Sequence, residues 1–214
     1  MDNSVPPRVG QGIPGFRLEA YCPERKRYCE VALEDLLNQG KWFILFFYPA
    51  DFSVVCPTEL AELAAIHAPL RELGCTVIAV SGDSVHTHLG WLRQESLLEQ
   101  VGFPMASDIR GRLAEALGIL DEHTGLPLRA TILVNPDGVI MDMEIAYFNV
   151  GRNVRELLRK VAAYMHITAN PKEACPAGWQ PGDTALTPDE ELVGRVETVW
   201  QAKKDVTDQG DDQD

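Results

Sequence analysis

One cysteine stands among polar residues directly after an apolar run that has the length of a strand. The stretch FFYPADFSVVCPTEL, 46–60, places Cys56 close to Ser53 and Glu59. A cysteine used for packing needs no polar cluster, and a metal site normally brings further ligands at short spacing. We therefore interpret the stretch as one that presents a single reactive sulfur.

A buried strand and a helix must position this sulfur. KWFILFFYP, 41–49, is a continuous apolar run, and TELAELAAIHAPLRELG, 58–74, repeats leucine and isoleucine at helical spacing up to a glycine. Cys56 then lies in the first turn of the helix, where Pro57 is tolerated. The unpaired N–H groups and positive dipole end of a helix start favour a thiolate. The alternative is a small buried apolar residue, which the polar neighbours disfavour.

Strands and helices alternate along the rest of the chain, with a late strand–turn–strand unit around Asn-Pro-Asp-Gly. This order predicts an α/β protein with a thioredoxin-like fold, in which helices flank a mixed central sheet. We expect further strands at 16–22, 28–33, 75–83 and 128–145 and helices at 31–40, 84–100, 110–120 and 153–167.

Both ends of the chain have compositions that cannot form a core alone. Residues 1–15 are rich in proline and glycine and are expected to form an extended arm. We expect one domain over 1–167, followed by a C-terminal arm over 168–214. A helix supported by a partner is expected within 187–205, and the acidic end, 207–214, is expected to be disordered.

The composition of the chain limits the kinds of partner that it is expected to bind. The hydrophobic share of 45% is that of an ordinary globular protein, and the formal charge of -13 opposes binding to nucleic acid. We interpret the basic residues of GRNVRELLRK, 151–160, as a solvated helix face. No signal peptide or membrane-spanning run is evident, so we expect a cytoplasmic protein without a membrane partner.

The other cysteines and histidines have more ordinary interpretations. Cys22 and Cys29 are expected to face each other across two strands, as a disulfide, part of a metal site or, the interpretation we favour, two buried thiols. Cys75 opens a core strand and is expected to be packing. His86 and His88 are two residues apart, which on a helix makes a poor metal pair.

The cysteine motif resembles that of a known family. PADFSVVCPTE, 49–59, resembles the Pro-x-x-x-Thr/Ser-x-x-Cys signature of the peroxiredoxins, and FFYPADF with CPTEL resembles their alkyl hydroperoxide reductase C branch. VSGDS, LRATILVNPDG, ACPAGWQPGD and ELVGRV resemble family segments in the same order, so the resemblance runs from about Val9 to Val196. ACPAGW resembles the resolving-cysteine segment of the typical two-cysteine class.

The resemblance implies a role for each matching residue. Cys56 is the peroxidatic sulfur, which attacks a peroxide oxygen and becomes a sulfenic acid. Ser53 hydrogen-bonds the thiolate and the peroxide, and Pro49 shields the pocket from water. Arg129 holds the thiolate and the developing negative charge, and Glu59 orients this arginine.

The resemblance also implies partners. Cys175 is the resolving cysteine, which forms a disulfide with Cys56 of a second subunit, so the chain is a homodimer, commonly within a ring of five dimers. Substrates are hydrogen peroxide and small organic hydroperoxides. The electron donor is a thioredoxin or a flavin-dependent disulfide reductase, and the chain itself needs no cofactor and no metal.

One departure from the family bears on inactivation by excess peroxide. Relatives that are sensitive to hyperoxidation carry a Gly-Gly-Leu-Gly insertion and a Tyr-Phe pair, where this chain has LLEQVGF and ETVWQ. We therefore expect a robust enzyme. Two rival functions stay open: a thioredoxin-type thiol–disulfide oxidoreductase, which the absence of CxxC disfavours, and a holdase chaperone or peroxide sensor.

Overall fold

The computed structural model describes residues 5–201. The chain divides into two compact units between Leu158 and Arg159, and each unit is described by itself. This division falls inside a helix that spans Val154–Ala169. The expected domain boundary at residue 167 stays a prediction.

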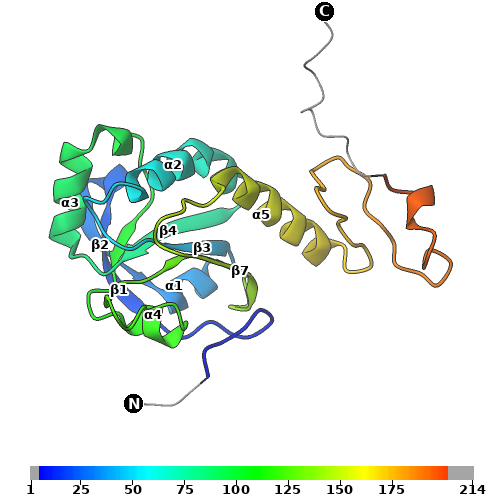
Figure 1. Cartoon of the computed structure of the whole chain (residues 1–214), viewed down its shortest axis with the longest axis horizontal. Helices are drawn as coiled ribbons and strands as arrows, with labels where there is room; N and C mark the ends of the chain where they lie inside the picture. The colour runs from blue at the N-terminus through cyan, green and yellow to red at the C-terminus, as the bar shows by residue number, and fades with distance from the viewer. Residues whose placement is uncertain (1–4, 202–214) are drawn as a thin grey trace, which may run out of the picture. The chain divides into compact units, whose positions relative to one another are not determined.

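The first unit is built on one mixed sheet (Figure 1), whose strands are β1 Arg17–Cys22, β2 Arg27–Ala32, β3 Trp42–Phe47, β4 Cys75–Ser81, β5 Met105–Ser107, β6 Arg129–Val134 and β7 Ile140–Ala146. Their order is β2-β1-β5-β4-β3-β6-β7. The three central strands β3, β4 and β5 are parallel to one another, and the strands on both sides pair antiparallel. The predicted thioredoxin-like mixed sheet is confirmed.

The helices match most of the expected positions: α1 Leu33–Asn38, α2 Cys56–Glu72, α3 Val85–Gln94, α4 Arg112–Ala116 and α5 Val154–Ala169. Gly40 takes a left-handed conformation, with φ 61°, just after α1 and ends this helix as predicted. The single helix expected over 84–100 is wrong, because Glu95 takes an extended conformation that ends α3. A short 3-10 turn, Ser96–Leu98, follows instead.

The core explains why β3 is apolar throughout. All six residues of β3 are buried, so both of its faces are covered. Phe43, Leu45 and Phe47 belong to a cluster that also contains Leu36 of α1 and Leu113 of α4. Helix α2 packs against β4 on the face of the sheet opposite to α1 and α4 (Figure 1). There it buries Leu60, Leu63, Ile66 and Leu70.

The β1–β2 hairpin corrects one expectation. The strands pair antiparallel as predicted, with Ala20 opposite Cys29 and Cys22 opposite Arg27. Cys22 and Cys29 are therefore diagonal neighbours, and their sulfurs form a disulfide with the Cα atoms 6.1 Å apart. The expectation of two buried thiols is wrong, because both side chains are half-buried at the sheet margin and meet across the hairpin.

The second unit contains most of α5 and the segment that follows it. Cys175 lies there in an extended segment beside an isolated bridge between Ala174 and Leu186. The helix expected over 187–205 is wrong for the described part, which holds turns and one 3-10 turn, Val196–Thr198. The predicted disorder of 207–214 lies outside the described residues. Within 5–201, no helix is long and apolar enough to cross a membrane.

Candidate active site

Cys56 is the first residue of α2, as the sequence predicts. Its side chain is fully buried, and Pro57 occupies the next helical position. The chain reaches it from the end of β3 through Tyr48 and Pro49, both of which are buried. The sulfur therefore lies where the first N–H groups of α2 have no partners within the helix, which is a favourable place for negative charge.

Strand pairing brings Arg129 to this sulfur. The antiparallel ladder between β3 and β6 places Phe47 opposite Ala130, so Arg129 lies beside the end of β3 from which the chain continues to Cys56. Its Nη1 atom donates to Cys56 Sγ over 3.3 Å. Its Nε atom donates to the Phe148 carbonyl oxygen at 2.8 Å, which fixes the plane of the guanidinium. Arg129 is itself buried, so this contact is shielded from water.

Glu59 connects the arginine to the helix. It lies three residues after Cys56, so both side chains lie on one face of α2. Its Oε2 atom accepts from Arg129 Nη1 at 2.6 Å. The predicted orientation of Arg129 by Glu59 has this contact as its geometric basis, whereas the catalytic effect of that orientation stays a prediction.

Arg152 completes the cluster, and the sequence interpretation of 151–160 as a solvated face is wrong for this residue. Its side chain is 1% exposed and donates twice to Glu59, from Nε at 2.9 Å and from Nη2 at 3.1 Å. The guanidinium carbon lies 3.5 Å from the centroid of the Phe46 ring.

The four side chains form a buried set of charges. Arg129 and Arg152 are always protonated near neutral pH, and Glu59 supplies one negative charge. Glu59 is shared by the two guanidiniums, and Glu144 is a further negative charge that acts on Arg152. The Arg129 guanidinium, in hydrogen-bond contact with Cys56 Sγ, favours negative charge on this sulfur.

Opposing effects act on Glu59. Burial by itself would raise the pKa of its carboxyl, but the hydrogen bonds and charge of Arg152, followed by the charge of Arg129, hold that pKa below its ordinary value of 4.5. Burial lowers the pKa of the Arg152 guanidinium, and Glu59 opposes that shift. Glu59 is therefore ionised at neutral pH.

The remaining predicted residues have different surroundings. Ser53 is half-buried, and its hydroxyl donates to the Ala50 carbonyl oxygen at 2.9 Å, so its hydrogen bond to the sulfur stays a prediction. Cys175 belongs to the second unit, where its thiol lies 3.8 Å from the Ala163 carbonyl oxygen. Burial raises the pKa of the Cys175 thiol, Arg159 lowers it and Glu173 raises it.

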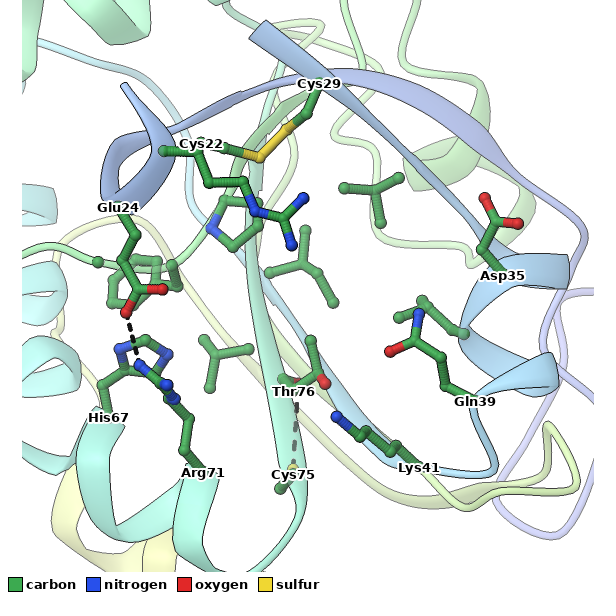
Figure 2. Close-up of a pocket in the computed structure, with 18 of the residues that line it drawn as sticks. Cys22, Glu24, Cys29, Asp35, Gln39, Lys41, His67, Arg71, Cys75 and Thr76 are labelled. Carbon is green, nitrogen blue, oxygen red and sulfur yellow. Dashed lines mark hydrogen bonds and ion pairs between the residues drawn. A yellow bond between two sulfur atoms is a disulfide. The ribbon is translucent and has the colours of Figure 1, made fainter. Parts of the chain in front are cut away.

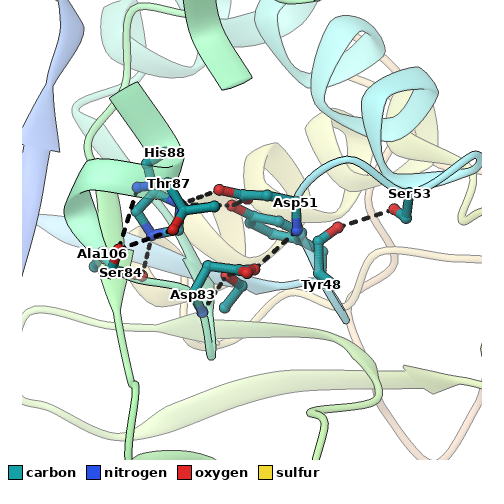
Figure 3. A network of polar contacts seen from close by, with 10 residues as sticks. Tyr48, Asp51, Ser53, Asp83, Ser84, Thr87, His88 and Ala106 are labelled. Carbon is teal, nitrogen blue, oxygen red and sulfur yellow. Dashed lines mark hydrogen bonds and ion pairs between the residues drawn. The ribbon is translucent and has the colours of Figure 1, made fainter. Parts of the chain in front are cut away.

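A buried polar network anchors the loop between β3 and α2 (Figure 3). The Asp51 carboxylate accepts from the Tyr48 hydroxyl at 2.7 Å and from His88 Nδ1 at 2.8 Å. The backbone N–H of Asp51 donates to Asp83 at 2.8 Å. His88 thus serves the loop, and the part of the chain that is described contains no cluster of residues able to hold a metal ion.

Fold and site together define a thioredoxin-like protein whose chemistry centres on a single cysteine. The AhpC/TSA family model matches residues 9–143. A second model, the C-terminal domain of 1-Cys peroxiredoxin, matches residues 164–201. The chain belongs to the AhpC/TSA family.

Named relatives agree with this assignment. The chain is 38% identical to alkyl hydroperoxide reductase C of Bacillus subtilis over 88% of its own length and 98% of the relative. Among solved structures, it is similar to Enterococcus faecalis AhpC, with a TM-score of 0.74, 40% identity and coverage of 78% of this chain and 98% of that one. The reduced 2-Cys peroxiredoxin of Plasmodium vivax gives a TM-score of 0.81 at 30% identity, covering 87% and 96%.

Arg152→Lys tests whether this missed residue positions the site. The substitution keeps the charge but loses the forked donors that hold Glu59, and thereby Arg129, in place. We expect the rate of Cys56 oxidation in single-turnover stopped-flow with hydrogen peroxide to fall about tenfold or more. Arg155→Lys is the matched control, since Arg155 lies three residues further along the chain, in α5, with its side chain 83% exposed. Equal rates in both variants would contradict the assigned role.

Glu59→Gln tests the charge set through stability. Removing the carboxylate leaves two buried guanidiniums uncompensated, so we expect the free energy of unfolding at neutral pH to fall by about 3 kcal/mol. Because the pKa of Glu59 is depressed in the folded state, its contribution is present above 4.5 and is lost as the pH falls through the lower folded value.

The difference in the free energy of unfolding between wild type and Glu59→Gln, measured by urea unfolding, should therefore shrink below pH 4.5. Glu62→Gln, on the same helix and exposed, should show little change at any pH. A difference for Glu59→Gln that is independent of pH would mean that its ionised form does not stabilise the fold.

Proposed function

We propose that this chain is a thiol peroxidase that reduces hydrogen peroxide and small organic hydroperoxides to water and alcohols. One observation carries the proposal: Cys56 Sγ is buried at the start of a helix and accepts a hydrogen bond from Arg129 Nη1 at 3.3 Å. Membership of the AhpC/TSA family supports the same reaction. No step of it uses a metal, haem or flavin of the chain.

The first step is a displacement at oxygen. The Cys56 thiolate attacks the terminal peroxide oxygen, an S–O bond forms and the O–O bond breaks. The other oxygen leaves with the electron pair and takes a proton, which gives water from hydrogen peroxide or an alcohol from an organic hydroperoxide. Cys56 is left as a sulfenic acid. Negative charge moves from sulfur to the leaving oxygen, so a fixed guanidinium next to both atoms stabilises the transition state.

The surrounding residues have distinct roles in this proposal. Arg129 touches the reacting sulfur and is assigned the stabilisation of the developing charge, with Glu59 and Arg152 as positioning residues behind it. Ser53 is assigned a hydrogen bond to the bound peroxide. Its hydroxyl donates to the Ala50 carbonyl oxygen in the structure, so it has to leave that acceptor in order to bind the peroxide. Pro49, which is buried, is assigned the exclusion of water.

The second step removes the sulfenic acid before more peroxide can oxidise it further. The Cys175 thiolate of a second subunit attacks the Cys56 sulfur, a disulfide forms and water leaves. Cys175 is half-buried beside the Ala163 carbonyl, in a segment that α5 also holds through Arg159 to the Trp179 carbonyl and through His166 to Glu173, so these contacts must open for Cys175 to reach a second subunit. We assign the peroxidase domain to 1–167 and the resolving arm to 168–214.

The partners follow from this chemistry. We propose a homodimer, and apolar side chains at the exposed edge of the sheet support it, since Tyr147 and Ile145 beside the outer strand β7 are exposed. Five dimers forming a ring, and a thioredoxin or a flavin-dependent disulfide reductase as the donor, belong to the proposal. A cytoplasmic location suits the free thiols of Cys56, Cys75 and Cys175.

Cysteine variants separate this function from its rivals. Cys56→Ser should abolish rapid peroxide consumption, because no other described cysteine has a cationic contact of this kind. Cys175→Ser should react once and accumulate sulfenic acid, without coupled turnover. Cys75→Ser is the control and should behave as wild type, since burial raises the pKa of Cys75 to about 12. Stopped-flow and non-reducing electrophoresis give both readouts.

Two outcomes would contradict the proposal. Continued donor-coupled turnover in Cys175→Ser would exclude Cys175 as the resolving residue. Suppression of aggregation by Cys56→Ser, together with undetectable peroxide consumption by the wild type, would favour a chaperone. A dimer-sized band linked through Cys56 and Cys175 after one equivalent of peroxide is the expected result.

We also expect resistance to hyperoxidation, because the sequence differs from sensitive relatives at LLEQVGF and ETVWQ. In the described part of the arm, turns and one 3-10 element occupy 187–201 in place of the expected helix. Mass spectrometry after modest peroxide doses with a working reductant should find Cys56 mainly as thiol or disulfide. Mostly sulfinic acid after single turnovers would overturn this expectation.

A further inference from the structure

The disulfide between Cys22 and Cys29 is unused by the peroxidase chemistry. It lines a cleft of about 480 Å³, together with Glu24, Lys41 and Arg71 (Figure 2). Cys29 also lines a second cleft that contains Glu19, Tyr28, Glu30, Val85 and His86. Both cysteine side chains are half-buried, so solvent reaches this bond from more than one side.

Sheet topology separates this disulfide from Cys56. Cys22 ends β1, and its neighbour Tyr21 pairs with Met105 at the start of β5. The same cleft is lined by Cys75, the first residue of β4, and by the residue before β3. The disulfide therefore lies at the end where the parallel strands begin, whereas Cys56 follows the end of β3. The six residues of β3 separate the disulfide from Cys56, a length of about 20 Å at the usual rise per residue. This separation excludes direct exchange between Cys56 and the disulfide within one subunit.

The hairpin does not depend on this bond for its pairing. Six residue pairs join β1 to β2, and β1 is held on its other side by β5. The Tyr21 and Tyr28 rings pack edge to face with their centroids 5.8 Å apart. An ion pair between Arg17 and Glu30 also crosses the two strands. Reduction of the disulfide thus leaves a folded hairpin.

Charges of both signs line the cleft beside these sulfurs: the carboxylates of Glu24, Glu30 and Asp35, and the cations of Arg25, Lys41 and Arg71. Glu30 is paired with Arg17, outside the cleft. In the cleft, Arg71 is paired with Glu24 at 2.6 Å. Arg25 and Lys41 also line it, and neither has an ion pair within residues 5–201, while Asp35 is the carboxylate there without one. Nearby cations stabilise a thiolate leaving group, and a low-energy leaving thiolate speeds exchange.

A third cysteine in the cleft does not compete for the bond. Burial raises the pKa of the Cys75 thiol to about 12, so it stays protonated and is a poor nucleophile at neutral pH. The cleft itself therefore offers no attacking thiolate.

We propose that Cys22–Cys29 is a second redox centre, which exchanges with anionic thiols that enter this cleft past Arg25 and Lys41, the cations there that have no ion pair within residues 5–201. The thiolate attacks one sulfur, the S–S bond breaks and the other cysteine leaves as a thiolate that takes a proton from water. A second thiolate then attacks the mixed disulfide. The external thiols become a disulfide, and the protein gains two thiols and two electrons. The external disulfide reverses the reaction.

The proposal rests on the cytoplasmic location proposed above and not on peroxide reduction. Disulfides that occur in a reducing compartment are usually redox-active and not permanent. The centre would thus report the thiol–disulfide ratio of its surroundings, independently of the peroxide that oxidises Cys56. A small anionic monothiol and an acidic dithiol protein share the required chemistry.

The test uses the full chain with Cys56→Ser and Cys175→Ser, so that failure of the peroxidase proposal cannot affect it. The oxidised protein is incubated with glutathione, thioredoxin or uncharged 2-mercaptoethanol under native conditions, and thiol formation is followed by differential alkylation and mass mapping. We expect reduction through a mixed disulfide with glutathione or with thioredoxin. Reduction that occurs only after unfolding in denaturant would overturn the proposal.

A second comparison tests anion selection. Arg25→Gln with Lys41→Gln should slow exchange with glutathione about fivefold and leave the rate with 2-mercaptoethanol unchanged. Arg155→Gln, outside the cleft, should change neither rate. Equal effects on the charged and uncharged thiols would exclude Arg25 and Lys41 as the recognition element. Thermal unfolding of the reduced and oxidised protein should remain cooperative, and loss of the folded state on reduction would show that the bond is a structural staple.

Discussion

The carboxylate of Glu59, held between two guanidiniums, is the interaction on which the site depends. Arg129 and Arg152 both donate to it in a buried environment, with distances from 2.6 to 3.1 Å. Neither arginine could remain there without a negative partner, since an uncompensated buried charge is costly. The same carboxylate fixes Arg129 relative to the sulfur. The contacts that balance the buried charges are therefore the same contacts that position Arg129 for the reactivity proposed for Cys56.

Backbone geometry delivers these groups to one place. The end of β3 leads into α2, which carries Cys56 and Glu59 one turn apart, and the neighbouring strand β6 begins with Arg129. Arg152 arrives from the segment before α5, where the backbone passes close to Glu59 and its N–H also donates to that carboxylate at 2.8 Å. The network around Asp51 holds the loop that joins strand to helix. Helix α2 and strand β6 thus supply three of the four side chains of the set, Cys56, Glu59 and Arg129.

Local signals in the sequence predicted part of this arrangement. The start of α2 at Cys56 followed from the apolar run, Pro57 and the helical spacing, all of which act over a few residues. Arg129 was found through the family resemblance alone, because 73 residues separate it from Cys56 and only strand pairing joins them. Arg152 was missed, because a basic residue before an amphipathic helix usually faces water. The state of Cys22 and Cys29 was also missed, since a packed thiol and a disulfide leave the same pattern in a hairpin.

The central claim is that the Arg129 guanidinium, 3.3 Å from Cys56 Sγ and held by Glu59, stabilises negative charge on that sulfur. The most direct measurement is the ultraviolet absorbance of the thiolate in fully reduced protein at neutral pH, taken as the difference between wild type and Cys56→Ser. The account predicts a signal that depends on Cys56 and that is lost in Arg129→Met. A wild type without that signal, or a signal that is unchanged in Arg129→Met, would contradict it.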